Sequence, residues 1–237
     1  MPEFTRCNVL AGAASLMASP LALPTATEAA APPLGNQVPS YYRYKVGSYE
    51  LTAILDGIRP TKLDADTNQA RNASLEDVQR ALAAGFLPTD RVGIYFYPTV
   101  VNTGSKLVLI DTGNGVRQKE TGHAAATMVA AGIDPRHVDI VVISHFHGDH
   151  IGGLRTADKA LAFPNAEIKV PAKEWAYWAD DGIMSCAPKA RQRSFHNVRR
   201  AFAGITDRVT RYEWGAEVAR ASPRSTRTAI RRATPRS

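Results

Sequence analysis

The sequence predicts an α/β (α+β) fold in which helices cover a mixed β-sheet. Near the amino terminus, strand-type runs at 42–46 and 49–55 flank Gly47-Ser48, a hairpin pattern. From residue 124 onward, strand-type and helix-type segments alternate, which is typical of parallel strands joined by helices. The chain has 237 residues, 44% of them hydrophobic, and shows no internal repeat. It can therefore bury one substantial core.

Each expected element has a local signal. Runs rich in β-branched and aromatic residues predict strands at 92–97, 107–110 and 138–143. A capping pattern predicts an amphipathic helix over 74–84 that ends at Gly85. The other expected elements are a hairpin turn within 101–106, helices over about 124–131, 172–178 and 190–202, and strands over 167–170 and 209–213.

Three imidazoles and one carboxylate follow the expected strand 138–143 within six residues: His145, His147, Asp149 and His150. Functional side chains often lie where a core strand meets a loop, and the three glycines of this segment allow a tight turn. Imidazole and carboxylate suit a borderline ion such as zinc. The segment therefore predicts a metal site rather than a surface histidine tract or a hydrogen-bonded wall.

This segment resembles the H-x-H-x-D-H signature of the metallo-β-lactamase superfamily. The resemblance implies an αββα sandwich, mainly its N-terminal half, with the second half incomplete. It also implies that His145 and His147 bind one Zn²⁺, and that Asp149 and His150 bind a second, Asp149 being catalytic as well. Asp111, which ends an upstream strand, would orient the metal ligands, unless it is an ordinary turn-capping aspartate.

The same resemblance implies a zinc-type hydrolase whose metal-bound hydroxide attacks an ester, lactone, amide or phosphotriester bond. The sequence around the motif is similar to that of the methyl parathion hydrolase-like and lactonase-like branches of the superfamily. We expect a small-molecule substrate and neither a nucleic acid nor a membrane as partner; the oligomeric state stays open. Five aromatic residues are expected to line an apolar pocket or to pack in the core: Tyr97, Phe146, Trp175, Trp178 and Phe195.

The amino terminus predicts an export signal peptide over residues 1–31, followed by the partial metallo-β-lactamase-like domain over 32–219. Arg6 precedes the apolar run 9–18, which is too short to span a bilayer. The segment is similar to a twin-arginine signal in which Cys7 replaces the second arginine. We expect a periplasmic or secreted protein, with cytoplasmic retention as the fallback.

Residues 220–237 form an aberrant tail with six arginines and no lysine, aspartate or glutamate, and we expect it to be disordered. One interpretation is a basic segment that binds an anionic surface or nucleic acid. The favoured interpretation is a frame-shifted translation. Read from the last base of the Thr228 codon, permitted third bases spell Gly-His-Thr-Pro-Gly-His-Thr-Ser-Phe, which resembles a further histidine motif of the same superfamily.

The sequence as it stands lacks the third histidine, the bridging aspartate and the last histidine that the resemblance implies. The alternative function is therefore an inactive truncated fragment that binds one zinc ion weakly or none. The remaining histidines, His123, His137 and His196, are expected at the surface or in packing rather than as ligands. An incomplete second half is also expected to leave an apolar surface uncovered.

Overall fold

The computed structural model of the protein describes residues 38–64, 70, 72–116, 120–219 and 230–231. The chain divides into the units 1–38 and 39–237, and every element described below lies in the second unit. The expected signal peptide and most of the expected arginine-rich tail, residues 220–229 and 232–237, lie outside the described residues. No helix among the described residues is long and apolar enough to cross a membrane.

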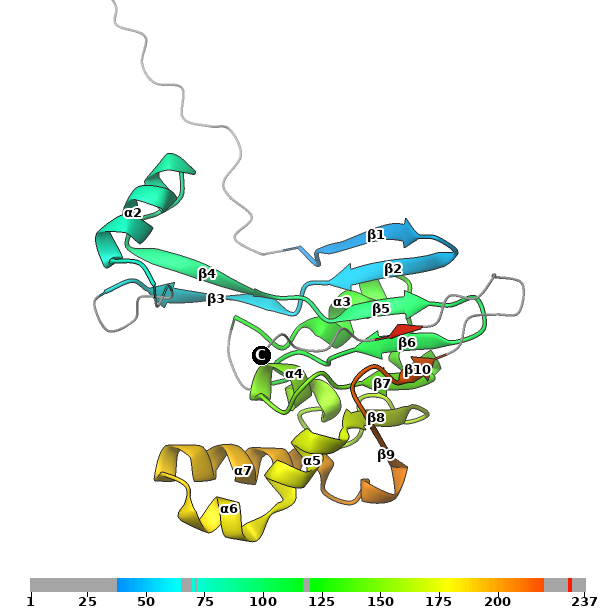
Figure 1. Ribbon diagram of the computed structural model, residues 1–237. Helices are drawn as coiled ribbons and strands as arrows, with labels where there is room; N and C mark the ends of the chain where they lie inside the picture. Colours follow the sequence, from blue (N-terminus) through cyan, green and yellow to red (C-terminus); the bar gives the residue numbers. More distant parts are fainter. Residues whose placement is uncertain (1–37, 65–69, 71, 117–119, 220–229, 232–237) are drawn as a thin grey trace, which may run out of the picture. The chain divides into compact units, whose positions relative to one another are not determined.

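A seven-stranded mixed sheet organises the second unit, in the order β1-β2-β5-β6-β7-β8-β9 (Figure 1). Its strands are β1 (Tyr41–Val46), β2 (Tyr49–Ile54), β5 (Thr99–Asn102), β6 (Leu107–Ile110), β7 (Ile140–Val142), β8 (Glu167–Pro171) and β9 (Val209–Tyr212). The first four pair antiparallel, and β6 to β9 pair parallel. The predicted change from hairpins to parallel strands is confirmed.

Five helices lie in the connections between consecutive parallel strands of this sheet. They are α3 (Ala124–Ala130), α4 (Gly148–Ile151), α5 (Ala172–Ala179), α6 (Asp181–Cys186) and α7 (Lys189–Phe202), with short 3₁₀ turns at Pro135–His137, Gly152–Leu154 and Thr206–Arg208. All four predicted helices are confirmed to within two residues: α2 (Leu75–Ala84), α3, α5 and α7. The sequence interpretation missed α6, because six residues with a glycine carry little periodic signal.

Helix α2 connects β3 (Gly57–Lys62) and β4 (Arg91–Phe96), which form a separate two-stranded sheet. At its start the Ser74 side chain accepts from the Asp77 amide, and the Asp77 carboxylate accepts in turn from the Ser74 amide, so the predicted capping box is present. Strand β3 was not expected, since Pro60 lies within it and proline is depleted in strands.

Alternating side chains of the sheet build two cores. On one face, Leu109 and Val141 pack with residues of α3, α5 and α7. On the other face, Val108 and Val142 pack with Val218 of β10 (Glu217–Ala219), which pairs with β11 (Ile230–Arg231). These residues of the second face are buried, so the expected uncovered apolar surface does not lie at this cluster. The exposed apolar residues include Tyr41, Tyr42, Tyr44 and Val46 on the edge strand β1.

Candidate metal centre

The neighbouring parallel strands β6 and β7 bring Asp111 next to the histidine motif. Parallel strands end at the same edge of a sheet, and Asp111 directly follows β6 while Ser144 lies two residues after β7. The Asp111 amide donates to the Val142 carbonyl at 2.9 Å, and the Ser144 amide donates to Asp111 Oδ1 at 2.6 Å. Asp111 has a left-handed φ of 58°, a backbone conformation that aspartate adopts more readily than most residues.

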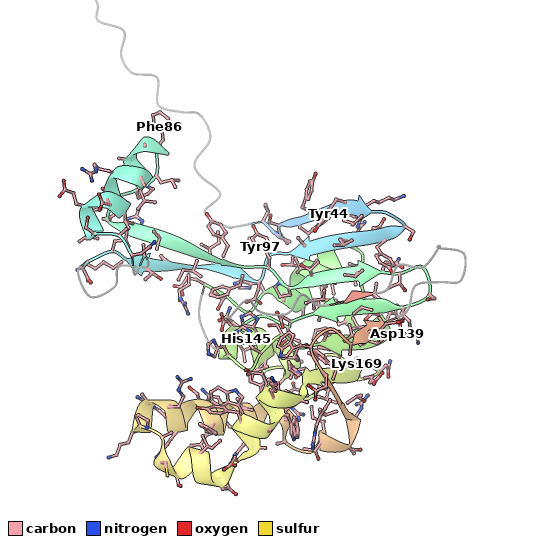
Figure 2. All side chains as sticks on the ribbon, viewed as in Figure 1. Tyr44, Phe86, Tyr97, Asp139, His145 and Lys169 are labelled. Carbon is pink, nitrogen blue, oxygen red and sulfur yellow. The ribbon has the colours of Figure 1, made fainter. Side chains whose placement is uncertain are left out.

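His145, which is labelled in Figure 2, contacts the other two imidazoles of the motif. The ring centroid of His145 is 4.6 Å from that of His147 and 3.9 Å from that of His150. His147 occupies the position before the first residue of α4, with no capping hydrogen bond from its side chain, and Asp149 and His150 lie within this one-turn helix. His150 Nε2 is 3.5 Å from Asp149 Oδ2. The structure therefore brings all four predicted ligands together.

Polar side chains contact the Nδ1 atoms of His145 and His150. Asp111 Oδ2 lies 2.9 Å from His150 Nδ1, and Ser144 Oγ lies 2.9 Å from His145 Nδ1 and 3.0 Å from His150 Nδ1. A carboxylate at Nδ1 fixes the tautomer of an imidazole and leaves Nε2 for an ion. Asp111 thus makes the contact expected of an orienting residue. Ser144 was not predicted, and a serine before a histidine motif gives no distinctive signal.

The pKa of His145 lies below its usual value, chiefly because the ring is half-buried and next because His150 and His147 are close. A lowered pKa favours the neutral imidazole, which is the form that binds a metal.

The donor set fits a zinc-type ion by its chemistry. Three imidazoles and a carboxylate are ligands that zinc accepts. The contacts of His145 and His150 with Ser144 and Asp111 fall on Nδ1, whereas Nε2 of His150 faces Asp149, which is itself a proposed ligand. Within the described part of the chain, however, no three histidine, cysteine, aspartate or glutamate side chains already converge on one point suited to an ion. His145 contacts His147 and His150, and His150 contacts Asp149. The metal site therefore remains a prediction.

Two of the motif's glycines allow a close approach between backbones. A Cβ on Gly152 would overlap the carbonyl of Asn114, and a Cβ on Gly153 would overlap the carbonyl of Thr112. Across the same contact, the Thr112 amide and hydroxyl both donate to the His150 carbonyl at 2.8 Å. These glycines thus serve to dock the motif onto the segment that follows Asp111.

The buried Asp56, which the sequence interpretation missed, organises that segment. Its carboxylate accepts from the amides of Asn114, Gly122 and Ala124 at 2.9 to 3.1 Å and from Asn114 Nδ2 at 3.0 Å. The one sequence signal for this role is that an aspartate follows a strand and is therefore a candidate for burial. A buried charge needs several hydrogen-bond partners, so such a residue is expected to organise the backbone around it.

Glu174 of α5 is a second missed residue. Its Oε2 accepts from the Phe146 amide and from Trp178 Nε1, both at 2.9 Å. A glutamate four residues before a tryptophan on a helix could have predicted the second contact. Nothing in the sequence indicated the first, which joins residues 28 positions apart.

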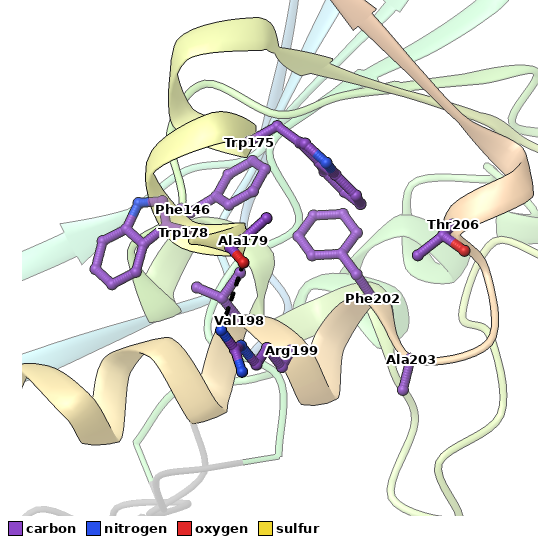
Figure 3. Close-up of a pocket in the computed structure, with 9 residues that line it drawn as sticks. All are labelled: Phe146, Trp175, Trp178, Ala179, Val198, Arg199, Phe202, Ala203 and Thr206. Carbon is purple, nitrogen blue, oxygen red and sulfur yellow. Dashed lines mark hydrogen bonds between the residues drawn. The ribbon is translucent and has the colours of Figure 1, made fainter. Parts of the chain in front are cut away.

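The five aromatic residues divide between pocket and core. Phe146, Trp175 and Trp178 line a cavity of about 230 Å³ together with residues of α7 (Figure 3). Phe195 is fully buried beneath Trp178, at a centroid distance of 4.7 Å. Tyr97 is exposed and stacks on Tyr95. The other histidines, His123, His137 and His196, are exposed, as expected.

Comparison with known proteins gives the family. The sequence pattern of the metallo-beta-lactamase superfamily matches residues 97–217, just over half of the chain. The curated "Beta-lactamase-like protein 2 homolog" of Caenorhabditis elegans is 34% identical over 112 residues, which cover 47% of this chain and 32% of that protein.

Solved structures are similar over most of this chain. The hydrolase AbOPH, described as in the beta lactamase superfamily, matches with a TM-score of 0.68 and 26% identity over 77% of this chain and 64% of that chain. AidC, a dizinc quorum-quenching lactonase, shares the fold with a TM-score of 0.68 and 22% identity over 76% and 64% of the two chains. The chain spans about a third of the curated relative and just under two thirds of both structures. It belongs to the metallo-beta-lactamase superfamily, and its structural neighbours include a hydrolase of the beta lactamase superfamily.

Proposed function

We propose that this chain is a zinc-dependent hydrolase of small molecules with an ester, lactone or phosphotriester bond. The observation that carries the proposal is the cluster of His145, His147, Asp149 and His150 at the end of β7, with Asp111 at His150 Nδ1. The family assignment and the similarity to the hydrolase AbOPH support the reaction class. The bond types rest on the resemblance of the motif to lactonase-like and methyl parathion hydrolase-like sequences.

The residues would divide the work as follows. His145 and His147 would hold one ion, and Asp149 and His150 a second. A bound zinc-type ion supplies Lewis-acid activation of water and of the substrate oxygen under attack. Asp149 would orient the attacking water through its carboxylate. Asp111 and Ser144 would keep His150 and His145 in the orientations that present Nε2.

A second candidate is a chain that binds an ion and does not hydrolyse. It is favoured by one observation: no three metal-ligating side chains among the described residues are already arranged around one point. Two histidines alone give an ion fewer protein ligands than the three usual at catalytic zinc.

The deciding experiment measures zinc binding and hydrolysis on the same preparations. Zinc affinity would be determined by competition with a chelating dye, and hydrolysis with an aryl ester, an acyl lactone and an aryl phosphotriester. The variants are His145→Ala, His147→Ala and Asp149→Ala, with exposed His196→Ala as the matched control.

We expect the wild type and His196→Ala to bind zinc and hydrolyse at least one substrate. His145→Ala and His147→Ala are expected to lose zinc affinity by about tenfold or more, and Asp149→Ala to lose hydrolysis. Binding without hydrolysis in the wild type would select the second candidate. Equal zinc affinity in the wild type and His145→Ala would contradict both.

A further inference from the structure

The loop between β7 and α4 is tied to two carboxylates at alternate residues. Asp111 accepts the Ser144 amide at 2.6 Å, and Glu174 accepts the Phe146 amide at 2.9 Å. The two carboxylates come from different elements, the end of β6 and helix α5. Phe146 lies between the two proposed ligands of the first ion, so the second tie fixes the backbone from which both imidazoles project.

The surroundings of Glu174 make this tie rigid. The same Oε2 atom accepts from Trp178 Nε1 at 2.9 Å, one turn along α5, which restricts the glutamate to one orientation. Phe146 is 2% exposed, and its ring packs on Phe202 at 4.9 Å and edge-on against Trp175 at 6.3 Å. Helix α5 therefore holds the Phe146 amide, and α5 and α7 together hold its ring.

We propose that Glu174 is a positioning residue for the metal-binding loop, holding the Phe146 amide so that His145 and His147 stay set for one ion. This inference rests on the proposed zinc site. A hydrogen bond to an ionised acceptor is stronger than one between neutral groups. Because this bond already fixes the backbone of the loop, less conformational entropy is lost when the ion binds.

The test compares three substitutions at one position with a matched control. Glu174→Ala removes the acceptor. Glu174→Gln keeps an acceptor oxygen of the same reach, and Glu174→Asp shortens the side chain by one methylene and withdraws the carboxylate from both donors. Glu167→Ala, an exposed glutamate on β8 whose ion pair with Lys169 is 3.6 Å long, is the control.

The first readout is hydrogen exchange of the Phe146 amide in the metal-free protein, which does not depend on zinc. We expect exchange to be about tenfold faster or more in Glu174→Ala, the change that loss of one charge-assisted hydrogen bond produces. The increase should be smaller in Glu174→Gln, which keeps the acceptor without its charge, and absent in Glu167→Ala. Unchanged exchange in folded Glu174→Ala would overturn the proposal.

The second readout is zinc affinity together with the visible spectrum of the cobalt-substituted protein. Weaker binding and an altered cobalt spectrum in Glu174→Ala, largely restored in Glu174→Gln, are expected from a positioning role. A residue that only supports the fold would change neither in a folded variant. Wild-type affinity and spectrum in folded Glu174→Ala would refute the proposal. If Glu174→Ala does not fold, Glu174→Asp carries the same expectations.

The two readouts separate the failure of this inference from that of the proposed function. A wild type that binds no zinc contradicts the proposed function, and the exchange measurement then still decides whether Glu174 holds the loop.

Discussion

Asn114 donates two hydrogen bonds to one carboxylate oxygen of Asp56, from its backbone nitrogen at 2.9 Å and from Nδ2 at 3.0 Å. The two residues are 58 positions apart and both are buried. Asn114 lies three residues after Asp111, in the segment that docks onto the turn after α4. The Asp56 carboxylate therefore secures, from inside the protein, the segment that supports the candidate metal centre.

Replacing Asp56 by alanine is expected to lower the free energy of unfolding by about 3–5 kcal/mol, because several buried N–H donors would lose their acceptor at about 1–3 kcal/mol each. Three amides and the Asn114 side chain would lose their acceptor together. Urea unfolding measures the change. Asp90→Ala, at an exposed ion pair with Arg91, is the control and should leave the midpoint unchanged. A loss at Asp56 no larger than at Asp90 would show that the network is not stabilising.

Gly153→Ala is expected to destabilise the protein by about 1–3 kcal/mol, as insertion of a methyl group into a packed contact does. Its Cβ would overlap the Thr112 carbonyl, which is backbone and cannot rotate away. Gly85→Ala is the matched control, because its Cβ would meet only ordinary contacts of 3.4 Å or more. Thermal unfolding of both variants provides the comparison, and equal melting temperatures would argue against a close approach at Gly153.

Asp139 is expected to make stability depend on acidic pH. Partial burial raises the pKa of its carboxyl, but the Leu107 amide at 2.8 Å and the Lys106 ammonium at 2.9 Å outweigh this, so the pKa lies below its usual value. The folded state thus favours the ionised carboxylate. Its contribution is complete above the unfolded pKa of about 3.9, and is lost as pH falls through the lower folded pKa.

The measurement compares urea midpoints of wild type and Asp139→Asn between pH 7 and pH 2.5. The wild type should be the more stable at pH 7, and the difference should shrink as the pH approaches the folded pKa. The exposed Asp207→Asn serves as the control and should show no such convergence. A difference between wild type and Asp139→Asn that is constant with pH would rule out the assigned cause.

Local patterns predicted the elements well where the signal lies within a few neighbouring residues. The hairpin around Gly47 and the capping box at Ser74 are of this kind, because sequence neighbours make the contacts. The histidine motif was placed correctly after β7 for the same reason. Strand β3 and helix α6 were missed, since Pro60 in one and the short length of the other remove the periodic signal.

The supports of the candidate centre could not be predicted in the same way. Asp56 and Glu174 act over 58 and 28 positions, on backbone amides whose location depends on the whole fold. Any backbone amide can donate a hydrogen bond, so the residue type of the partner does not show that it will be used. Asp111 was found only because it resembles a family position, and the contact that explains it, with His150, spans 39 positions.

Asp111→Asn is expected to weaken zinc binding about 10- to 100-fold, the usual cost of altering a group that orients a metal ligand. Asparagine has the same shape and tolerates the left-handed φ of 58° that alanine would resist, so the fold should persist. The amide can still accept the Ser144 hydrogen bond, but it provides no charge at His150 Nδ1. Zinc affinity by competition, with circular dichroism on the same samples, measures both parts. Asp149→Asn, a proposed direct ligand, should cost at least as much affinity. If Asp111→Asn is folded and binds zinc as tightly as the wild type, Asp111 is the ordinary turn-capping aspartate of the alternative interpretation.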